Sequence, residues 1–393
     1  MASPASPTTP ASSASPATSA SFATSVSPAT SASAAASSFD FTLNGRVVRV
    51  DGNAPHSSAN TSLLTWLRNT GRTGSKEGCA EGDCGACTVA LVDTNAHGER
   101  TFRAINSCIT LLPMVAGREI VTVEGVAPSV PNDSSAPTLE ALHPVQRAMV
   151  QSYGSQCGYC TPGFIVSMFE AYYRDDLGSA SGSKATDADR RTREQIGDQL
   201  NGNLCRCTGY RPIREAMQQA LADRPAGAAD AVTPDLFQLR LHKNDGAIPA
   251  LAYEATAEAG EVAQTFVRPT TLDELLALKA RHREKAELVA GATEIGVYIN
   301  KQHRRYHLLV STDGVRELTT ITKSDTHFTF GGNATLTNLE EALAGEIPMI
   351  DKMLWAFASR QIRNRATLAG NIVTASPIGD MPPLLLALDA EVV

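Results

Sequence analysis

The run Gly78-Cys79-Ala-Glu-Gly-Asp-Cys84-Gly-Ala-Cys87 places three cysteines and three glycines in one short loop. With Cys108 it gives the spacing C-x4-C-x2-C…C, which is typical of the ligands of a plant-type [2Fe–2S] cluster. The glycines let the backbone wrap tightly and direct N–H groups at the sulfur atoms. Structural zinc and disulfides are the alternatives. Zinc sites usually contain C-x2-C pairs, and disulfides between neighbours in one tight loop would be strained.

A second group of cysteines consists of Cys157-Gly-Tyr-Cys160 and Cys205-Arg-Cys207. The first pair precedes an expected helix, and the second pair lies in an expected loop between two helices. The ends of a helical bundle can therefore bring four thiolates around one cluster. Taken alone, C-x2-C with C-x-C is equally compatible with zinc. The first motif favours iron–sulfur here, because the two sets together account for all eight cysteines.

A small α+β domain is predicted around the first motif, over residues 39–126. Residues 39–50 alternate apolar and polar side chains around Asn44-Gly45, which predicts a β-hairpin. Residues 61–71 have a hydroxyl cap, clustered apolar residues and a closing glycine, which predict a short helix. Further strands are expected at 88–92 and 119–123. One helix would thus pack on a small mixed sheet.

Four helices are predicted between residues 138 and 223, after a Pro/Ser-rich linker at 127–137. They are expected at 139–153, 164–173, 193–201 and 214–222, and Thr161-Pro162 introduces the second. This pattern predicts a small helical bundle. We expect residues 174–192 to form an exposed polar loop and residues 224–262 to form a linker.

A mixed α/β pattern fills residues 263–393. Thr271 caps a helix that ends near His282. Strands are expected at 287–290, 308–311 and 327–331, and helices at 337–343 and 351–358. The sequence ends after a leucine-rich stretch, residues 384–388, which we expect to remain without packing partners.

Composition describes an ordinary globular protein, with 42% hydrophobic residues, 19% charged residues and a net charge of −7. No basic patch indicates nucleic acid, and no Lys/Arg cluster or long apolar run indicates a membrane. Residues 1–38 consist mainly of Ala, Ser, Thr and Pro, without Lys or Arg. They predict a disordered tail rather than an export signal or an Arg-containing transit peptide, so we expect a cytoplasmic protein.

Two segments of the third region are candidates for a phosphate-bearing ligand. Leu288–Gly296 contains a glycine turn between an expected strand and helix, where N–H groups can meet a diphosphate. It lacks the G-x-G-x-x-G fingerprint, and a plain strand–helix turn is the alternative. Ala366–Asp380 is dense in small hydroxyl and amide residues, which suit a polar ligand or an irregular turn.

Three stretches of this sequence resemble the molybdenum hydroxylases, which include xanthine dehydrogenases, aldehyde oxidases and carbon monoxide dehydrogenases. The stretches are Cys79–Cys87, Gln156–Gly163 and Leu204–Tyr210. The resemblance implies a β-grasp ferredoxin-like domain and a four-helix domain, each holding one [2Fe–2S] cluster. It also implies that Gln156 touches the pterin of a molybdenum cofactor; a helix-end hydrogen bond is the alternative. The gap between the second-set cysteine pairs is longer than in the family, so residues 174–192 are expected to be an insertion.

Residues 266–393 resemble part of the family's FAD-binding domain, of mixed α/β fold. The resemblance implies flavin contacts at Leu288, Val289, Gly291, Ala292, Thr293, Glu294, Ile295, Phe330, Thr367, Gly370, Asn371, Val373, Thr374 and Asp380. Family members often have Asn at the position of Ala292. The family's domain continues beyond the equivalent of Val393. We therefore expect an incomplete domain that binds FAD weakly or not at all, unless a longer form or a partner completes it.

The resemblance implies an electron-transfer subunit. Electrons would leave a purine at a molybdenum cofactor on a partner chain, the large subunit of a hetero-oligomer. They would cross the helical-domain cluster, the ferredoxin-like cluster and FAD, and reduce NAD. No residue here is expected to catalyse hydroxylation. Fusion of both cluster domains to a flavin domain favours a xanthine dehydrogenase small subunit. A subunit of an aldehyde or heterocycle oxidoreductase, or a flavin-free electron carrier, remains the alternative.

Overall fold

The computed structural model describes residues 35–127, 138–177, 185–224, 235–241, 247–256 and 263–393, without the side chains of 185–192. Most of the expected tail at 1–38 and of the expected linker at 127–137 therefore lies outside the described residues. At the end of the expected tail, Ser38 already begins the first strand and Ala36 pairs with Tyr253. None of the described helices combines the length and apolar character needed to cross a membrane.

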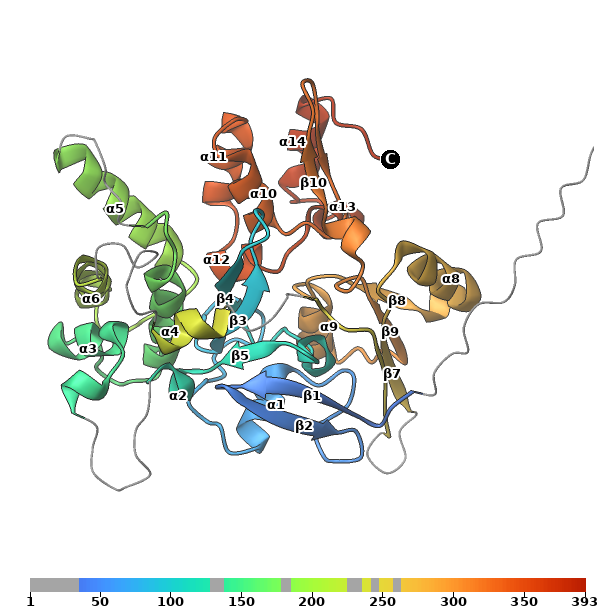
Figure 1. Cartoon of the computed structure of the whole chain (residues 1–393), viewed down its shortest axis with the longest axis horizontal. Coiled ribbons are helices and arrows are strands. Elements are labelled where there is room, and N and C mark those ends of the chain that lie inside the picture. The colour runs from blue at the N-terminus through green and yellow to red at the C-terminus, as the bar shows by residue number, and fades with distance from the viewer. Residues whose placement is uncertain (1–34, 128–137, 178–184, 225–234, 242–246, 257–262) are drawn as a thin grey trace, which may run out of the picture. The chain divides into compact units, whose positions relative to one another are not determined.

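A five-stranded mixed sheet contains the first expected strands (Figure 1). Its order is β2-β1-β5-β3-β4, with β1 parallel to β5 and the other neighbours antiparallel. The strands are β1 (Ser38–Leu43), β2 (Arg46–Asp51), β3 (Thr88–Thr94), β4 (Arg100–Asn106) and β5 (Glu119–Val121). Between them lie α1 (Leu63–Asn69) and a 3-10 turn, η1 (Leu112–Val115), and α2 (Val123–Val126) follows. The expected mixed sheet with one main helix is confirmed, although β4 was not predicted.

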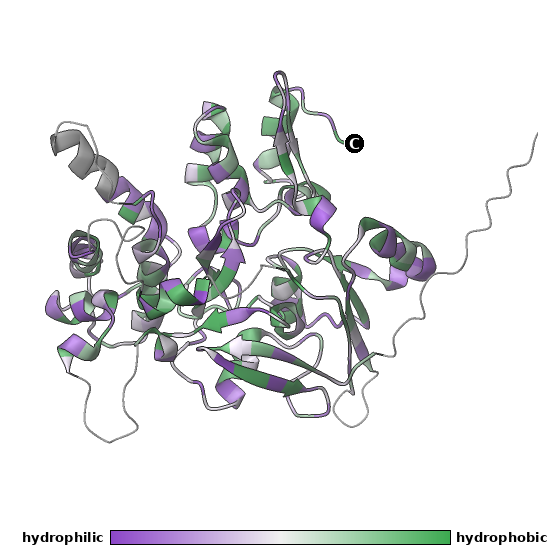
Figure 2. Cartoon of the chain, viewed as in Figure 1, coloured by the Kyte–Doolittle hydropathy of each residue, from purple (hydrophilic) through white to green (hydrophobic). Residues whose placement is uncertain are grey.

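The β1–β2 hairpin and α1 form for the reasons that the sequence indicates. Asn44 and Gly45 take left-handed φ angles of 54° and 78°, as a tight hairpin turn requires. Figure 2 shows hydrophobic and hydrophilic residues alternating along this hairpin. Ser62 caps α1 by accepting a hydrogen bond from the Thr65 backbone N–H at 3.1 Å. Trp66 of α1 then packs edge-on against Phe41, with ring centroids 5.4 Å apart.

The helical bundle consists of α3 (Pro144–Gln151), α4 (Thr161–Tyr172), α5 (Ala185–Leu200) and α6 (Arg211–Ala222), after the 3-10 turn η2 (Leu139–Ala141). The four expected helices are therefore present. Phe169 of α4 packs against Phe102 of β4, with ring centroids 4.8 Å apart, so the bundle shares a hydrophobic core with the first sheet.

The expected polar loop at 174–192 is wrong in part. Helix α5 already begins at Ala185, and Leu177 is buried. Arg224 donates hydrogen bonds to the carbonyl groups of Arg174 and Leu177, at 2.7 and 2.6 Å. Polar helix formers without an apolar period give no clear helix signal, which explains the error. Residues 178–184 lie outside the described part.

The expected linker at 224–262 also contains structure. Helix α7 (Leu236–Leu241) buries Phe237 against Phe169, with ring centroids 4.9 Å apart. Strand β6 (Leu251–Ala255) joins a four-stranded sheet of order β6-β7-β9-β8. The other strands are β7 (Gln264–Arg268), β8 (Glu287–Val289) and β9 (Leu308–Ser311). Long-range pairing, which the local pattern of β6 does not reveal, makes this segment a strand.

Helices surround this second sheet and lead into the last part of the chain. Helix α8 (Leu272–His282), capped by Thr271 as expected, is followed by the 3-10 turn η3 (Arg283–Lys285) and, after β8, by α9 (Ile295–Gln302). The remaining elements are η4 (Arg316–Thr319), β10 (Ile321–Lys323), β11 (Phe328–Phe330), α10 (Leu336–Leu343), α11 (Pro348–Ala356), α12 (Arg360–Arg363), α13 (Leu368–Thr374) and α14 (Met381–Ala387). Leu384 of α14 is buried in their hydrophobic cluster, whereas Leu386 is 81% exposed. The expectation that 384–388 lacks packing is therefore wrong for Leu384, and Leu385 and Leu388 also pack against this cluster.

A buried polar network at α12 joins the last part of the chain to the bundle and the first sheet. The Nη2 group of Arg363 donates to both carboxylate oxygens of Asp198 in α5, at 2.6 and 2.8 Å. Asn364 donates to the Ala104 carbonyl of β4 and to Glu170 of α4, at 2.9 and 3.0 Å. Because buried polar groups are costly unless they are paired, this network fixes how α12 packs.

Candidate functional site

The first cysteine set lies where the loop after α1 meets the segment that follows β4. Cys79 and Cys84 are partly exposed, whereas Cys87 and Cys108 are buried. The backbone N–H groups of Glu81 and Cys84 point at the Cys79 sulfur, at 3.5 and 3.3 Å. The expected N–H contacts to sulfur are thus present.

Glycines are required in this loop for two different reasons. Gly82 and Gly85 adopt φ angles of 97° and 64°, which side-chain-bearing residues rarely take. Gly78 has ordinary backbone angles, but a Cβ atom added there would lie 2.7 Å from the Cys84 sulfur. The loop can therefore bring its thiols together only with these small residues.

Thiol pairing is the main electrostatic feature of the first set. The sulfur atoms of Cys87 and Cys108 lie 3.3 Å apart. Their hydrogen bond lowers the pKa of the Cys87 thiol and, together with burial, raises the pKa of Cys108. Cys84 is also hydrogen-bonded to Cys79, although burial is the largest cause of the raised pKa of Cys84. The four thiols thus form two close pairs.

The second cysteine set shows the same pairing at the ends of the bundle helices. Cys157 and Cys160 precede α4, and Cys205 and Cys207 precede α6. Burial raises the pKa of Cys160 to about 12, and its hydrogen bond with Cys205 acts in the same direction. A hydrogen bond with Cys157 raises the pKa of Cys207.

Two thiol pairs per set suit the [2Fe–2S] cluster, in which each of two irons takes two thiolates. The Cys87–Cys108 sulfur contact at 3.3 Å is one such pair. These donor sets fit the dinuclear cluster expected from the sequence.

Hydrogen bonds connect the two cysteine sets directly. The Leu204 N–H, next to Cys205, donates to the Cys84 carbonyl at 3.0 Å. Asn203 donates to the Gly85 carbonyl at 3.1 Å, and the Tyr159 hydroxyl donates to the Glu77 carbonyl. A Cβ atom on Gly163 would lie 2.1 Å from the Gly85 carbonyl oxygen. The two ligand loops thus pack directly against each other.

The two expected flavin segments also meet. Gly291, after β8, lies so close to the second segment that an added Cβ atom would be 1.8 Å from the Arg365 carbonyl oxygen. Thr374 at the end of α13 donates to Glu294 at 2.9 Å. Segments more than seventy residues apart in sequence therefore form one surface.

Several of these residues have groups available for a ligand. The Asn371 Oδ1 atom is buried and has no hydrogen-bond partner within the described protein. Leu288 and Val373 are 41% and 83% exposed, although both are apolar. An unpartnered amide oxygen beside exposed apolar side chains fits a cofactor with both polar and flat apolar parts.

The remaining expected flavin residues lie around these two segments. Val289 is buried in β8, and Thr293, after β8, and Ile295, the first residue of α9, are partly buried. Thr367 caps α13 by accepting from the Gly370 N–H at 3.0 Å. Phe330 stacks on Phe328, with ring centroids 6.0 Å apart, and Asp380 is exposed before α14.

Ala292 has an unusual backbone conformation, with a φ angle of 62°. Asparagine tolerates this left-handed region better than alanine does. An asparagine at this position would therefore fit the backbone as well as supply an amide.

Sequence reasoning did not identify the residues that connect the sites. Besides Leu204 and Asn203, these include Gln361 of α12, which donates to Asn203 at 2.9 Å and to Ser167 at 3.0 Å. Asn300 of α9 also contacts the first cysteine set. Asn203, Gln361 and Asn300 lie outside the quoted motifs, and Leu204 lies at the edge of one, so no local signal indicated these contacts. Gln156, the expected pterin contact, is exposed beside Cys157, and its role stays a prediction.

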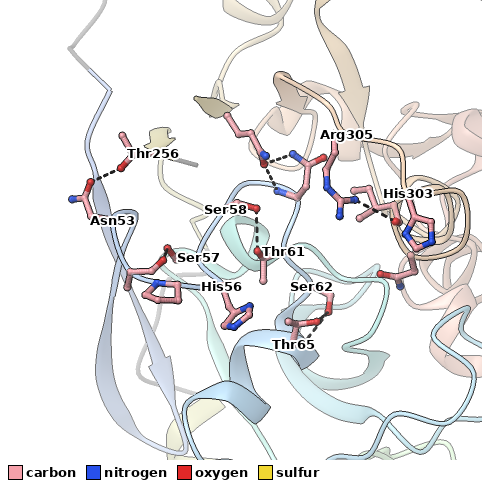
Figure 3. Close-up of a pocket in the computed structure, with 16 residues that line it drawn as sticks. Asn53, His56, Ser57, Ser58, Thr61, Ser62, Thr65, Thr256, His303 and Arg305 are labelled. Atoms are coloured by element: carbon pink, nitrogen blue, oxygen red, sulfur yellow. Dashed lines mark hydrogen bonds between the residues drawn. The ribbon is translucent and has the colours of Figure 1, made fainter. Parts of the chain in front are cut away.

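A cavity of about 600 Å³ lies between residues 53–65 and the end of α9 (Figure 3). Hydroxyl, amide and imidazole groups line it, and His303 and Arg305 lie on the side opposite Asn53 and Thr256. None of the expected cofactor residues is among those lining this cavity within the described chain. Asn300 lines it, so α9 separates the cavity from the first cysteine set.

Three known sequence families match successive parts of the chain. Residues 45–112 match a 2Fe-2S iron-sulfur cluster binding domain, and residues 122–218 match a [2Fe-2S] binding domain. Residues 260–393 match the FAD binding domain in molybdopterin dehydrogenase. The two expected clusters, FAD and the three-domain fold class are thereby confirmed.

Several known relatives that match most of this chain are xanthine dehydrogenases. The xanthine dehydrogenase of Drosophila pseudoobscura pseudoobscura is 34% identical over 398 residues, covering 90% of this chain and 28% of the relative. The xanthine dehydrogenase/oxidase of Mus musculus is 31% identical over 400 residues, covering 89% and 27%. The chain thus spans just over a quarter of the length of these relatives.

Among solved structures, quinoline 2-oxidoreductase from Pseudomonas putida 86 is 28% identical. The match covers 47% of this chain and 93% of that chain, with a TM-score of 0.34.

Proposed function

Because the chain belongs to the molybdenum hydroxylase family, we propose that it is the iron–sulfur and flavin part of a xanthine dehydrogenase. In this proposal it works with a molybdenum-cofactor large subunit that oxidises hypoxanthine or xanthine, and NAD is the final acceptor. Bound [2Fe–2S] clusters supply one-electron transfer, and bound FAD exchanges electrons with NAD. In this proposal the residues of this chain hold the two clusters and FAD one after another along the path of the electrons.

The eight cysteines are the proposed cluster ligands, in the two sets described above. Pairing of thiols within each set supports this assignment, as in the contact of the Cys87 and Cys108 sulfur atoms at 3.3 Å. Cluster binding releases the protons that the thiols share, because the thiolate is the ligand form. The Leu288–Ile295 and Thr367–Asp380 segments, with Phe330, are the proposed flavin contacts.

The observation that carries the proposal is that the second cysteine set contacts the first set, which in turn contacts the helix that follows the first flavin segment. The Leu204 N–H···O=C Cys84 hydrogen bond joins the second set to the first. Helix α9 begins at Ile295, within the first flavin segment, and contacts the first set through Asn300. This order supports electron flow from the second cluster to the first and then to FAD.

Cofactor content is the first test. The full chain, expressed in cells that supply clusters, should contain about four iron and four sulfide per chain. Cys84→Ser should remove one of two electron paramagnetic resonance (EPR) signals, and Cys205→Ser the other. Stoichiometric zinc in place of half of the iron would contradict the second site.

Electron transfer is tested from the acceptor side. NADH added to the flavin-loaded chain should bleach the cluster absorbance, and Cys84→Ser should block bleaching of the second cluster. Unbleached clusters in flavin-containing protein would refute the proposed order or the NAD assignment. With the molybdenum subunit added, xanthine should be a better substrate than aldehydes or other heterocycles; the reverse preference would contradict the purine assignment.

A further inference from the structure

Asn300 of α9 bridges the two chain segments that provide the first cysteine set. Its side-chain N–H groups donate to the Ala80 carbonyl at 2.9 Å and to the Cys108 carbonyl at 2.8 Å. Ala80 lies in the loop that carries three cysteines, whereas Cys108 is supplied by a separate segment. One amide therefore holds together the two parts of the ligand set.

Ala80 needs such support because of its backbone conformation. Its φ angle is 57°, in the left-handed region that is unfavourable for alanine. Such a conformation persists only when surrounding contacts impose it. The bond from Asn300 to the Ala80 carbonyl is one such contact.

Other contacts show that α9 is fitted to the same surface. A Cβ atom on Gly296 would lie 2.3 Å from the Ile109 carbonyl oxygen, so α9 approaches the backbone beside Cys108 closely. Val297 packs against the buried cluster that contains Cys87 and Cys108. Lys301 adds an exposed ion pair with Glu81, at 3.4 Å. Asn300 is thus held in place by its neighbours on the helix.

We propose that Asn300 is a positioning residue for the first [2Fe–2S] cluster. By holding the Ala80 and Cys108 carbonyl groups, it sets the spacing between the loop thiolates and the Cys108 thiolate. It touches no sulfur atom, so its effect reaches the cluster through the ligand backbone. The inference rests on the proposed function, in which the first cysteine set binds a cluster.

Loss of the two hydrogen bonds should make the first cluster labile. Removing a partner that orients metal ligands typically costs about 10–100-fold in metal affinity. Asn300→Leu keeps a similar shape without donors, and Asn300→Asp places acceptors against two carbonyl oxygens. Both variants should release iron from the first cluster about tenfold faster or more, with Asn300→Asp the more severe.

The experiment follows iron release from the full chain to a chelator, with each cluster monitored by its EPR signal. Gln302→Ala, at an exposed position on the same helix, is the matched control. The Asn300 variants should also broaden or shift the first-cluster signal before any iron is lost, which a loss of stability alone would not do. The second-cluster signal and Gln302→Ala should match the unaltered protein.

Equal iron release in Asn300→Leu and the unaltered chain would overturn the inference and leave the proposed function intact. Equal acceleration at both clusters would also overturn it, because the effect would then be general destabilisation. Absence of any [2Fe–2S] signal from the unaltered chain would overturn the proposed function and the inference together.

Discussion

His143 should make the helical bundle sensitive to mild acid. Burial lowers the pKa of His143 from 6.5 to about 4. Its Nδ1 atom accepts from the Val145 N–H at 3.3 Å, and its Nε2 atom lies 3.0 Å from the Tyr173 hydroxyl. Because the Tyr173 hydroxyl donates its own hydrogen to Asp235, the Nε2 atom of neutral His143 must carry the proton and donate to Tyr173. A second proton would have to bind Nδ1, where it would face the Val145 N–H group. Asp235 opposes the shift, and Arg147 reinforces it.

The sign of the effect follows from this depressed pKa. The unfolded chain binds a proton at His143 below pH 6.5, whereas the folded chain does so only near pH 4. The contribution of neutral His143 to the free energy of unfolding is therefore fully present above pH 6.5 and is lost as the pH is lowered toward 4. At 1.36 kcal/mol per pKa unit, lowering the pH from 7.5 to 5 should cost about 2 kcal/mol.

His143→Asn isolates this contribution because asparagine can still cap α3 but does not titrate. Urea unfolding of the bundle, followed by visible circular dichroism of its cluster, should be measured for both proteins at pH 7.5 and 5. The unaltered protein should lose about 2 kcal/mol more than the variant. Parallel pH dependence of the two proteins would refute the reasoning.

Three further changes test other features of the structure. Arg363→Met should lower the free energy of unfolding, measured with urea, by about 3–5 kcal/mol, because the Asp198 carboxylate remains buried without its partner. The double variant with Asp198→Asn should cost less than the two single changes added together; strict additivity would contradict this coupling. Gly163→Ala should weaken the EPR signals of both clusters, since the added methyl group would meet the Gly85 carbonyl oxygen; unaltered signals would show that the loops are not in contact. Ala344→Gly should raise the urea midpoint by an amount equivalent to about 0.5–1 kcal/mol, because this exposed residue ends α10 with a φ angle of 45°; a lower midpoint would be contrary evidence.

Local signals explain which parts of the fold could be predicted. The hairpin at Asn44-Gly45 and the helix that Thr271 caps depend on neighbouring residues, and both are present. Strand β6 depends instead on pairing with β7 and with Ala36, more than two hundred residues earlier. Its short sequence has no regular alternation, so it was interpreted as part of a linker.

The same distinction applies to the candidate site. The cysteine spacings and the Leu288–Gly296 turn indicate their chemistry within a few residues. Asn300 and Gln361 gain their roles only from partners far away in the sequence. Gln361 also lies in a charged run around α12, which resembles a solvated surface, although the structure buries it. Such residues become recognisable only when the tertiary contacts are known.

The position of Ile362 over the first cysteine loop has a consequence for synthesis on the ribosome. The Ile362 side chain lies so close to the loop that a Cβ atom added to Gly82 would be 3.0 Å from its Cδ1 atom. Ile362 also packs against the buried cluster that contains Cys87 and Cys108. The first ligand set is complete once Cys108 has been made, about 250 residues before Ile362. At about 5–20 residues per second, translation takes on the order of 10–50 s to cover that distance. Iron and sulfide can therefore reach the nascent loop before the part of the chain that covers it exists.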